Sequence, residues 1–255
     1  MAYRHIAIER DGKRVTLTLN RPPANHLSIA VLDEMNQGLL EIRGRDGVEV
    51  LVIRGAAGVF CEGLDLRDHE RARLQRLLQV YSRIFETIRM IDMVTIAAVE
   101  GNAWGSGFEL ALGCNLIVAS ETASFRLPEI DRGIIPHIAA IVLPRVVPRR
   151  KAMEWILTGD AITARDLEHF GLLNRVLPED GFEDGLSAFA GALMAKSGPV
   201  LQLAKRAQYE SYYSTYEEAL YRVQNLYMRE LMELADPVEG VTAHLEGRTP
   251  VWKDR

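Results

Sequence analysis

Hydrophobic and polar residues alternate in two short runs near the start of the chain. Residues 5–10 and 15–19 follow this period of two, and Asp11 and Gly12 between them favour a tight turn, so we expect a β-hairpin. Ser28 then precedes a run with helical periodicity, which predicts a helix capped by the Ser28 hydroxyl. The apolar positions of this helix are Ile29, Leu32, Met35, Leu39 and Ile42.

Three continuous apolar runs predict buried strands farther along the chain, at 48–53, 94–99 and 116–119. Helical patterns separate these runs, one over 71–90 and one that begins near Gly105. Strands that alternate with helices are typical of a largely parallel sheet with crossover connections. The sequence therefore predicts an α/β core.

The pattern changes after Pro136, where helical periodicity dominates and only 173–177 resembles a core strand. One apolar stripe near the end predicts a helix that stops at Pro237. The stripe consists of Leu220, Val223, Tyr227, Leu231 and Leu234. We therefore divide the chain into a core, residues 1–195, and a helical part, residues 196–255, which packs on the core or on neighbouring subunits.

Composition and charge narrow the class of protein. With 48% hydrophobic and 25% charged residues, the 255-residue chain has the composition of one large globular domain. Its net charge of −5 argues against a general nucleic-acid binder, because such binding needs excess positive charge. The apolar runs are far shorter than the ~20 residues of a membrane-spanning helix, and the first residues lack the apolar core of a signal peptide. We therefore expect a cytoplasmic protein without nucleic-acid or membrane partners.

The positions of cysteine and histidine bear on metal binding. Cys61 and Cys114 are too far apart in sequence for a paired metal or redox motif. The six histidines show no close metal-ligand spacing. We expect neither a metal ion nor a disulfide.

Segment 101–109, with the sequence GNAWGSGFE, follows a predicted buried strand and opens a predicted helix. Its glycines let the backbone approach a ligand closely, and the free N–H groups at a helix N-terminus suit an anion or a developing oxyanion. A turn that serves only tight packing is the competing interpretation. Leu110 stands where a dinucleotide fingerprint needs its third glycine, and Trp104 where a nucleophile elbow needs its first.

Glu109 is the only charged residue between Gly101 and Ser120. A lone carboxyl in an apolar helix is expected to be at least partly buried, and burial would favour its protonated form and prepare it for proton transfer. An acid that only complements the helix dipole is the competing interpretation. Asp65 and Glu129 follow core strands in charged loops, where exposed surface acids are the simpler explanation.

Four motifs occur in order along the chain, at 20–25, 60–66, 96–101 and 125–129. Their sequences are NRPPAN, FCEGLDL, IAAVEG and FRLPE. With these motifs, nearly the whole chain resembles the crotonase (enoyl-CoA hydratase/isomerase) superfamily. The resemblance implies a spiral of ββα repeats and an acyl-CoA substrate, with no cofactor other than the coenzyme A of that substrate. It also implies that the helical C-terminal part covers the pocket and builds homotrimers, commonly paired into hexamers.

The resemblance assigns roles to residues of these motifs. It places the amides of Leu64 and Ser106 in an oxyanion hole for the thioester carbonyl, which agrees with the free N–H groups expected at Ser106. It makes Glu109 and Glu129 the carboxyl pair of a hydratase, one base and one acid, with a single water between them. Further positions expected to contact the acyl-CoA are Ala24, Asn25, His26, Glu62, Gly63, Asp65, Leu66, Gly105 and His137.

Several residues depart from the family pattern. Ser106 replaces a usual glycine, which the oxyanion role tolerates because only the backbone N–H is needed. Arg126 and Leu127 replace the usual Gly-Gln before the second glutamate, and residues 135–140 lack the family's glycine-rich turn. These departures lie close in sequence to Glu109 and Glu129, the expected carboxyl pair.

Pro136, residues 143–145 and the tail from 226 to 252 resemble the cyclic dienoyl-CoA hydratases. We therefore expect hydration of a conjugated acyl-CoA thioester, with a cyclic dienoyl-CoA as a candidate substrate. Two alternatives stay open. One is an isomerase or a ring-opening hydrolase of the same superfamily, and His137 supports the hydrolase. The other is a non-catalytic acyl-CoA- or RNA-binding homologue, against which the glutamate pair and the acidic balance argue.

Overall fold

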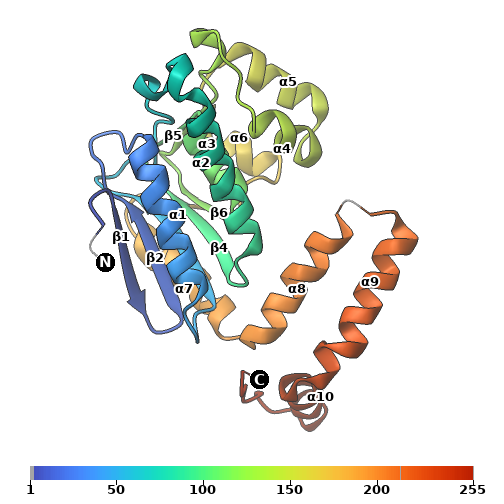
Figure 1. The fold of residues 1–255 in the computed structure, drawn as a ribbon. Coiled ribbons are helices and arrows are strands. Elements are labelled where there is room, and N and C mark those ends of the chain that lie inside the picture. The colour runs from blue at the N-terminus through green and yellow to red at the C-terminus, as the bar shows by residue number, and fades with distance from the viewer. Residues whose placement is uncertain (1–2, 213, 255) are drawn as a thin grey trace.

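The computed structural model describes residues 3–212 and 214–254. Its strands are β1 (Ile6–Asp11), β2 (Arg14–Leu19), β3 (Val50–Gly55), β4 (Val94–Val99), β5 (Asn102–Trp104), β6 (Leu116–Ser120), β7 (Ser124–Arg126), β8 (Ile162–Thr163) and β9 (Arg175–Leu177). They form a six-stranded sheet in the order β1-β2-β3-β4-β6-β9 and a three-stranded sheet in the order β5-β7-β8 (Figure 1).

The larger sheet confirms the predicted core. β1 and β2 form the expected hairpin, with Ile6 opposite Leu19 and Asp11 opposite Arg14. Every other neighbouring pair in this sheet is parallel. The smaller sheet is absent from the prediction because its strands have only two or three residues each, too few to show a period.

Helices connect and cover the strands. The α-helices are α1 (Ile29–Arg43), α2 (Arg71–Met90), α3 (Ser106–Gly113), α4 (Ala139–Val146), α5 (Arg149–Thr158), α6 (Ala164–His169), α7 (Phe182–Met194), α8 (Gly198–Ser211), α9 (Tyr216–Arg229) and α10 (Ala235–Glu246). The 3₁₀ turns are η1 (Leu66–His69), η2 (Ile130–Arg132) and η3 (Leu231–Glu233). The Ser28 hydroxyl accepts a hydrogen bond from Val31 N at 3.4 Å, so the predicted cap of α1 is confirmed.

Alternate residues of the buried strands face opposite layers. Leu51 and Ile53 of β3 belong to the apolar cluster that includes α1 and α2, whereas Val50 and Val52 pack with residues of α7. Figure 1 shows α1 and α2 on one face of the sheet and α7 on the other. Burial on both faces explains why these strands have continuous rather than alternating apolar runs.

The helical C-terminal part extends away from the core, and α8 and α9 lie side by side in it (Figure 1). The helical character predicted for this part is confirmed. The division after residue 195 falls between α7 and α8, and its functional meaning stays a prediction. Several large apolar side chains of α9 and α10 are exposed, among them Tyr216, Leu220, Tyr221, Val241 and Leu245.

The helix expected to stop at Pro237 ends earlier, so that prediction is wrong. α9 ends at Arg229, η3 follows, and Pro237 is the third residue of α10. Proline fits the first turn of a helix because the N–H groups there have no partner within the helix. The predicted stripe is therefore divided between α9, η3 and the residue before α10.

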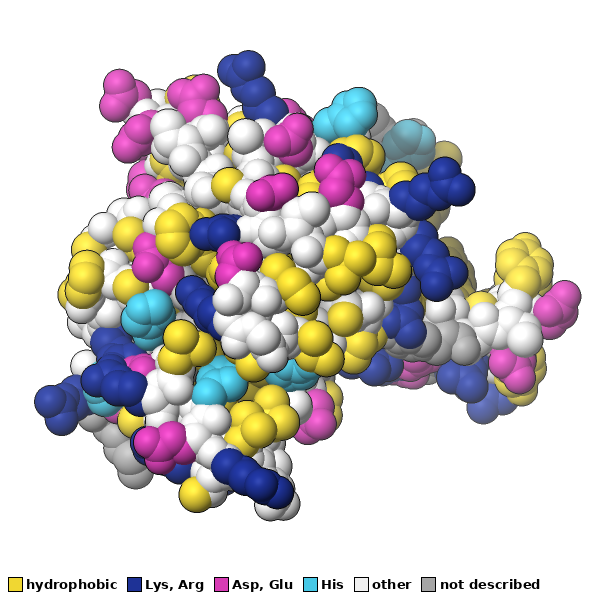
Figure 2. Space-filling view, turned by 90° about the horizontal axis from the view of Figure 1, so that it is seen from above, with side chains coloured by type: hydrophobic (Ala, Val, Ile, Leu, Met, Phe, Trp, Pro, Cys, Tyr) yellow, Lys and Arg dark blue, Asp and Glu magenta, His cyan; other side chains and the backbone are white. Residues whose placement is uncertain are grey.

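The distribution of charge on the surface agrees with the nearly balanced numbers of acidic and basic residues. Figure 2 shows acidic and basic side chains interspersed over one face of the molecule. Across residues 3–212 and 214–254, none of the helices combines the length and the apolar character needed to cross a membrane.

The start of α3 packs against the loop after β3 without room for a side chain at Gly107. A Cβ there would lie 2.0 Å from the backbone oxygen of Cys61. Gly107→Ala should therefore lower the free energy of unfolding by about 1–3 kcal/mol. A Cβ at Gly191 in α7 would meet no other atom within 4 Å. Gly191→Ala should therefore raise the free energy of unfolding by about 0.5–1 kcal/mol, because alanine favours a helix more than glycine does. Urea denaturation measures both, and equal effects would contradict this packing.

Candidate active site

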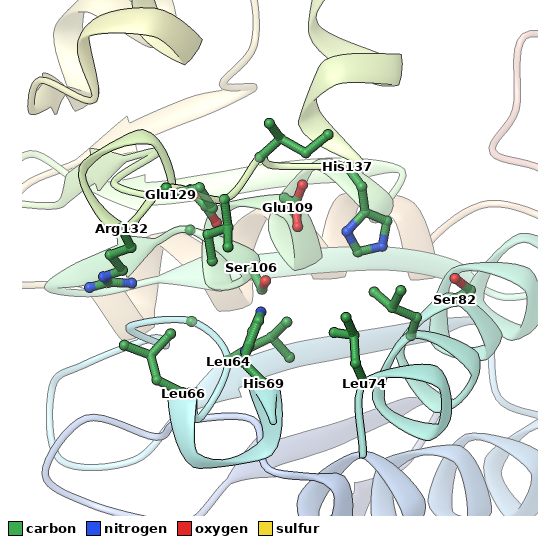
Figure 3. Close-up of a pocket in the computed structure, with 16 residues that line it drawn as sticks. Leu64, Leu66, His69, Leu74, Ser82, Ser106, Glu109, Glu129, Arg132 and His137 are labelled. Carbon is green, nitrogen blue, oxygen red and sulfur yellow. The ribbon is translucent and has the colours of Figure 1, made fainter. Parts of the chain in front are cut away.

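A pocket of about 500 Å³ lies between η1 and α2 on one side and the segment 129–137 on the other (Figure 3). Its polar lining residues are His69, Ser82, Ser106, Glu109, Glu129, Arg132 and His137. Its apolar lining residues are Leu64, Leu66, Leu74, Leu78, Ile134 and Ile135. This mixture suits a ligand with an apolar body and a reactive polar group.

Two backbone segments meet at one wall of the pocket. A Cβ at Gly63 would lie 3.1 Å from Trp104 O and 3.4 Å from Ser106 N, and the φ of +97° at Gly63 also favours glycine. Leu64 and Ser106 both line the pocket. In the described part of the chain, neither of their amides donates a hydrogen bond to another residue. The wall therefore offers two free N–H donors on adjacent segments.

Short backbone contacts hold these two segments together. Cys61 N donates to Asn102 O, and Trp104 N donates to Cys61 O, each at 2.9 Å. The Asn102 side-chain amide also donates to Glu62 Oε1 at 2.7 Å. The loop after β3 is thus fixed against the turn that opens α3.

Glu109 lies in the first turn of α3 and is only 1% exposed, so its predicted burial is confirmed. The amides of Ile138 and Ala139 both donate to its Oε1 at 2.8 Å. The Tyr81 hydroxyl donates to its Oε2 at 2.8 Å. Three donors and the N-terminal end of α4 therefore surround this buried carboxyl with groups that stabilise a carboxylate.

Tyr81 is fully buried on α2, and its hydroxyl also lies 3.2 Å from Ser106 O. Burial, followed by the charge of Glu109, raises the pKa of Tyr81 well above its ordinary value. The hydroxyl therefore keeps its proton near neutral pH and acts as a donor to Glu109. The Tyr81 ring also contacts the His137 ring edge-on, with centroids 5.1 Å apart.

Glu129 lies immediately before η2 and is 6% exposed, so the interpretation of an exposed surface acid is wrong. Burial, followed by the negative charge of Glu109, raises the pKa of Glu129 to about 7. Its Oε2 is buried and has no hydrogen-bond partner within the described residues. A Cβ at Gly105 would lie 2.6 Å from Glu129 Oε1, so a side chain at 105 would displace this carboxyl.

The two carboxyls therefore differ in what their surroundings stabilise. Glu109 accepts hydrogen bonds from three donors, whereas Glu129 is buried near the negative charge of Glu109, and its Oε2 has no hydrogen-bond partner among the described residues. The pocket therefore holds a carboxylate that three donors stabilise beside a carboxyl whose pKa of about 7 lets it both hold and release a proton near neutral pH. Such a pair can take one proton and give another within one reaction.

Asp65 does not line the pocket, and it is not the exposed surface acid that its loop suggested. It is 7% exposed and caps η1 by accepting a hydrogen bond from Arg67 N. Arg67 and then Arg21, whose guanidinium donates to Asp65 at 2.9 Å, lower the pKa of Asp65. In this structure Asp65 fixes the turn that carries His69, and its predicted contact with acyl-CoA stays a prediction.

The remaining predicted contact residues divide into two groups. Gly63, Leu66, Gly105 and His137 line the pocket. Ala24, Asn25, His26 and Glu62 do not. Asn25 is fully buried, and its side-chain amide donates to Ala56 O and Val59 O. It therefore holds loops together, and binding of acyl-CoA by this second group stays a prediction.

Several pocket residues were missed from the sequence. Leu74, Leu78 and Ser82 follow one another at intervals of four on α2, so helical periodicity places them on one face. That spacing was a usable signal. His69 and Arg132 lie in short turns, where no period indicates which way a side chain points.

Residues 3–212 and 214–254 contain no group of three or more His, Cys, Asp or Glu side chains placed to hold a metal ion.

Comparisons with known proteins place the chain in a family. The model of the family described as Enoyl-CoA hydratase/isomerase matches residues 11–255. The protein named Probable enoyl-CoA hydratase echA8 of Mycobacterium bovis is 34% identical, over the full length of both chains. The human protein named Enoyl-CoA hydratase domain-containing protein 3, mitochondrial, is 31% identical, over 96% of this chain and 82% of its own length.

Solved structures agree with these relatives. The crystal structure of an enoyl-CoA hydratase from Bacillus anthracis has a TM-score of 0.93 at 28% identity, and covers 99% of this chain and 100% of its own. The structure of human enoyl Coenzyme A hydratase domain-containing protein 3 has a TM-score of 0.92 at 29% identity, and covers 98% and 100%. The predicted crotonase fold is confirmed, and the chain belongs to the enoyl-CoA hydratase/isomerase family of enzymes.

Proposed function

We propose that this protein is an enoyl-CoA hydratase, which adds water across the conjugated double bond of an acyl-CoA thioester. The observation that carries the proposal is the pair of buried carboxyls, Glu109 and Glu129, whose surroundings favour opposite protonation states in one pocket. The names of relatives that match the whole chain support the same activity.

The two free amides have a natural role in this reaction. When water adds to the β-carbon, the electrons of the double bond move toward the thioester carbonyl and form an enolate. The amides of Leu64 and Ser106 would donate to that oxygen as its negative charge grows. Preorganised donors of this kind stabilise such a transition state by about 3–4 kcal/mol each.

The carboxyl pair would then move the two protons. Ionised Glu109 takes a proton from the attacking water, whose oxygen bonds to the β-carbon. Protonated Glu129 gives its proton to the α-carbon of the enolate. Water is thereby added across the double bond, and the protonation states of the two carboxyls return to the start by exchange with solvent.

The acyl group is part of the proposal. The more specific candidate substrate is a cyclic dienoyl-CoA. It rests on the resemblance of residues 136, 143–145 and 226–252 to the cyclic dienoyl-CoA hydratases. Loss of the absorbance of the conjugated thioester on addition of crotonyl-CoA or of a cyclic dienoyl-CoA measures hydration, and mass spectrometry should show the gain of one water. An isomerised or ring-opened product would instead favour one of the other superfamily reactions.

We further propose that the protein is a cytoplasmic homotrimer, or a pair of trimers. Exposed apolar residues on the projecting helices α9 and α10, such as Leu220, Tyr221 and Leu245, support a partner surface there. Burial of apolar area would stabilise that association. Analytical ultracentrifugation should give a mass that is a multiple of three chains, and a stable monomer at micromolar concentration would contradict the proposal.

Replacing either carboxyl of the pair by its amide removes proton transfer while keeping the size of the side chain. Glu109→Gln and Glu129→Gln should each lower kcat by ~10²–10⁴-fold. Because both residues serve one step, the double variant should lose much less than the product of the single losses. Steady-state kinetics with the best enoyl-CoA substrate measures all three variants.

Glu121 provides a matched control, since it is an exposed glutamate in the turn after β6, away from the pocket. Glu121→Gln should hydrate the same substrate at the wild-type rate. If Glu129→Gln also kept the wild-type rate while Glu109→Gln did not, the paired mechanism would be wrong.

A further inference from the structure

We propose that Tyr81 is a positioning residue for hydration, whose hydroxyl holds the Glu109 carboxylate by Oε2 and leaves that oxygen one site for the proton of the attacking water. The inference rests on the proposed function, because it takes Glu109 as the base of that reaction. It goes beyond that function by giving a role to a residue that does not line the pocket. It also names the oxygen of Glu109 that takes the proton.

The hydrogen bonds of Glu109 are divided unevenly between its two oxygens. Oε1 accepts from the amides of Ile138 and Ala139, both at 2.8 Å. Oε2 accepts from the Tyr81 hydroxyl, also at 2.8 Å. A carboxylate oxygen has about two lone-pair sites, so the donors among the described residues fill Oε1 and leave about one site on Oε2. Oε2 is therefore the oxygen with capacity for a proton.

Packing fixes the position of the Tyr81 ring. The residue is fully buried on α2. Its ring meets Phe85 edge-on with centroids 5.0 Å apart, and it meets His137 in the same way at 5.1 Å. His137 directly precedes Ile138, whose amide donates to Glu109. The ring thus contacts the segment that binds Oε1 while its hydroxyl binds Oε2, so the carboxylate is held from both ends.

The Tyr81 hydroxyl contacts a second group at the start of α3. It lies 3.2 Å from Ser106 O, and Ser106 and Glu109 are one helical turn apart. Figure 3 shows the Glu109 carboxyl close to Ser106 in the pocket. A hydroxyl has one proton to donate, and the shorter contact goes to the carboxylate, which is the stronger acceptor. One hydroxyl therefore joins the base to the residue whose amide is expected in the oxyanion hole.

Tyr81 keeps its own proton throughout the proposed step. As the water oxygen bonds to the β-carbon, one O–H bond of the water breaks and its proton bonds to Oε2 of Glu109, which becomes a neutral carboxyl. Burial, followed by the charge of Glu109, raises the pKa of Tyr81 well above its ordinary value, so the hydroxyl stays protonated. Once Oε2 has lost its charge, the hydroxyl can donate to Ser106 O instead.

Tyr81→Phe keeps the buried ring and removes only the hydroxyl. The kcat for hydration should fall by about 10–10²-fold, because the carboxylate loses the donor that orients it. The Kd of hexanoyl-CoA, a saturated thioester that cannot be hydrated, should change by less than about twofold, since Tyr81 does not line the pocket. Steady-state kinetics and isothermal titration calorimetry measure the two effects, and an unchanged Kd shows that the pocket of the variant is formed.

The Glu109→Gln background separates positioning from a general effect on the fold. Because Tyr81 acts through Glu109, adding Tyr81→Phe to Glu109→Gln should lower kcat by less than about twofold further. A hydroxyl that only stabilises the fold would cause about the same loss in both backgrounds.

Tyr3→Phe is the matched control. The Tyr3 hydroxyl also donates to a glutamate, Glu41 Oε2 at 3.0 Å, and neither residue lines the pocket. This variant should keep the wild-type kcat and the wild-type Kd for hexanoyl-CoA.

The outcomes separate this inference from the hydratase proposal. A wild-type kcat in Tyr81→Phe, or an equal loss in the wild-type and Glu109→Gln backgrounds, overturns the role of Tyr81 and leaves the hydratase proposal standing. A weaker binding of hexanoyl-CoA that accounts for the whole loss of activity overturns it as well, because Tyr81 would then act on binding. If the wild-type protein hydrates no enoyl-CoA, the hydratase proposal is wrong, and this role of Tyr81 is wrong with it.

Discussion

The site depends on the burial of one carboxylate, Glu109, among three hydrogen-bond donors of the protein. Burying an ionised carboxyl without partners is so unfavourable that the group takes up a proton instead. Here Tyr81 from α2 and two amides at the start of α4 satisfy the carboxylate. Two helices from separate parts of the sequence, α2 and α4, are thereby held at the first turn of α3.

The state of Glu129 follows from that arrangement. The negative charge of Glu109 adds to the effect of burial and raises the pKa of Glu129 from its ordinary value of 4.5 to about 7. Between these two pH values the native state holds a proton that the unfolded state has released. Stability therefore falls as pH rises through this window. The protein thus keeps a buried carboxyl that titrates near neutral pH, at a cost to its own stability in alkaline solution.

Glycine at two positions makes this geometry possible. Gly107 lets α3 approach the loop after β3 so closely that no side chain fits between the two backbones. Gly105 leaves room for the Glu129 carboxyl. The same contact brings Leu64 and Ser106, with their free amides, to one wall of the pocket. Packing and chemistry thus depend on the same few residues, and a methyl group at either glycine would disturb both.

The sequence was most informative where a pattern was long or a residue was out of place. The buried strands and α2 were predictable because apolar runs and helical periods extend over several residues. Glu109 was predictable because a lone charge interrupts an apolar segment. Its partner Tyr81 was not, since an aromatic residue in a helical stripe has the pattern of an ordinary core residue.

Other features were hidden for different physical reasons. Pro237 can end a helix or stand in its first turn, and local sequence does not distinguish the two. The amides of Ile138 and Ala139 carry no side-chain signal, because any residue supplies an N–H. The local sequence around Asp65 and Glu129 did not indicate their burial, because Arg21, which binds Asp65, and Glu109, whose charge acts on Glu129, lie in other segments.

The central claim is that burial beside the Glu109 carboxylate raises the pKa of Glu129 to about 7. Infrared difference spectra recorded between about pH 6 and about pH 8 test it most directly, because a protonated carboxyl has a C=O band separate from those of carboxylates. The wild-type protein should lose one such band over this range, and Glu129→Gln should lack the change. In Glu109→Gln the band should disappear at lower pH, since the like charge is gone. A band that persists in Glu129→Gln and vanishes in Glu109→Gln would contradict the account.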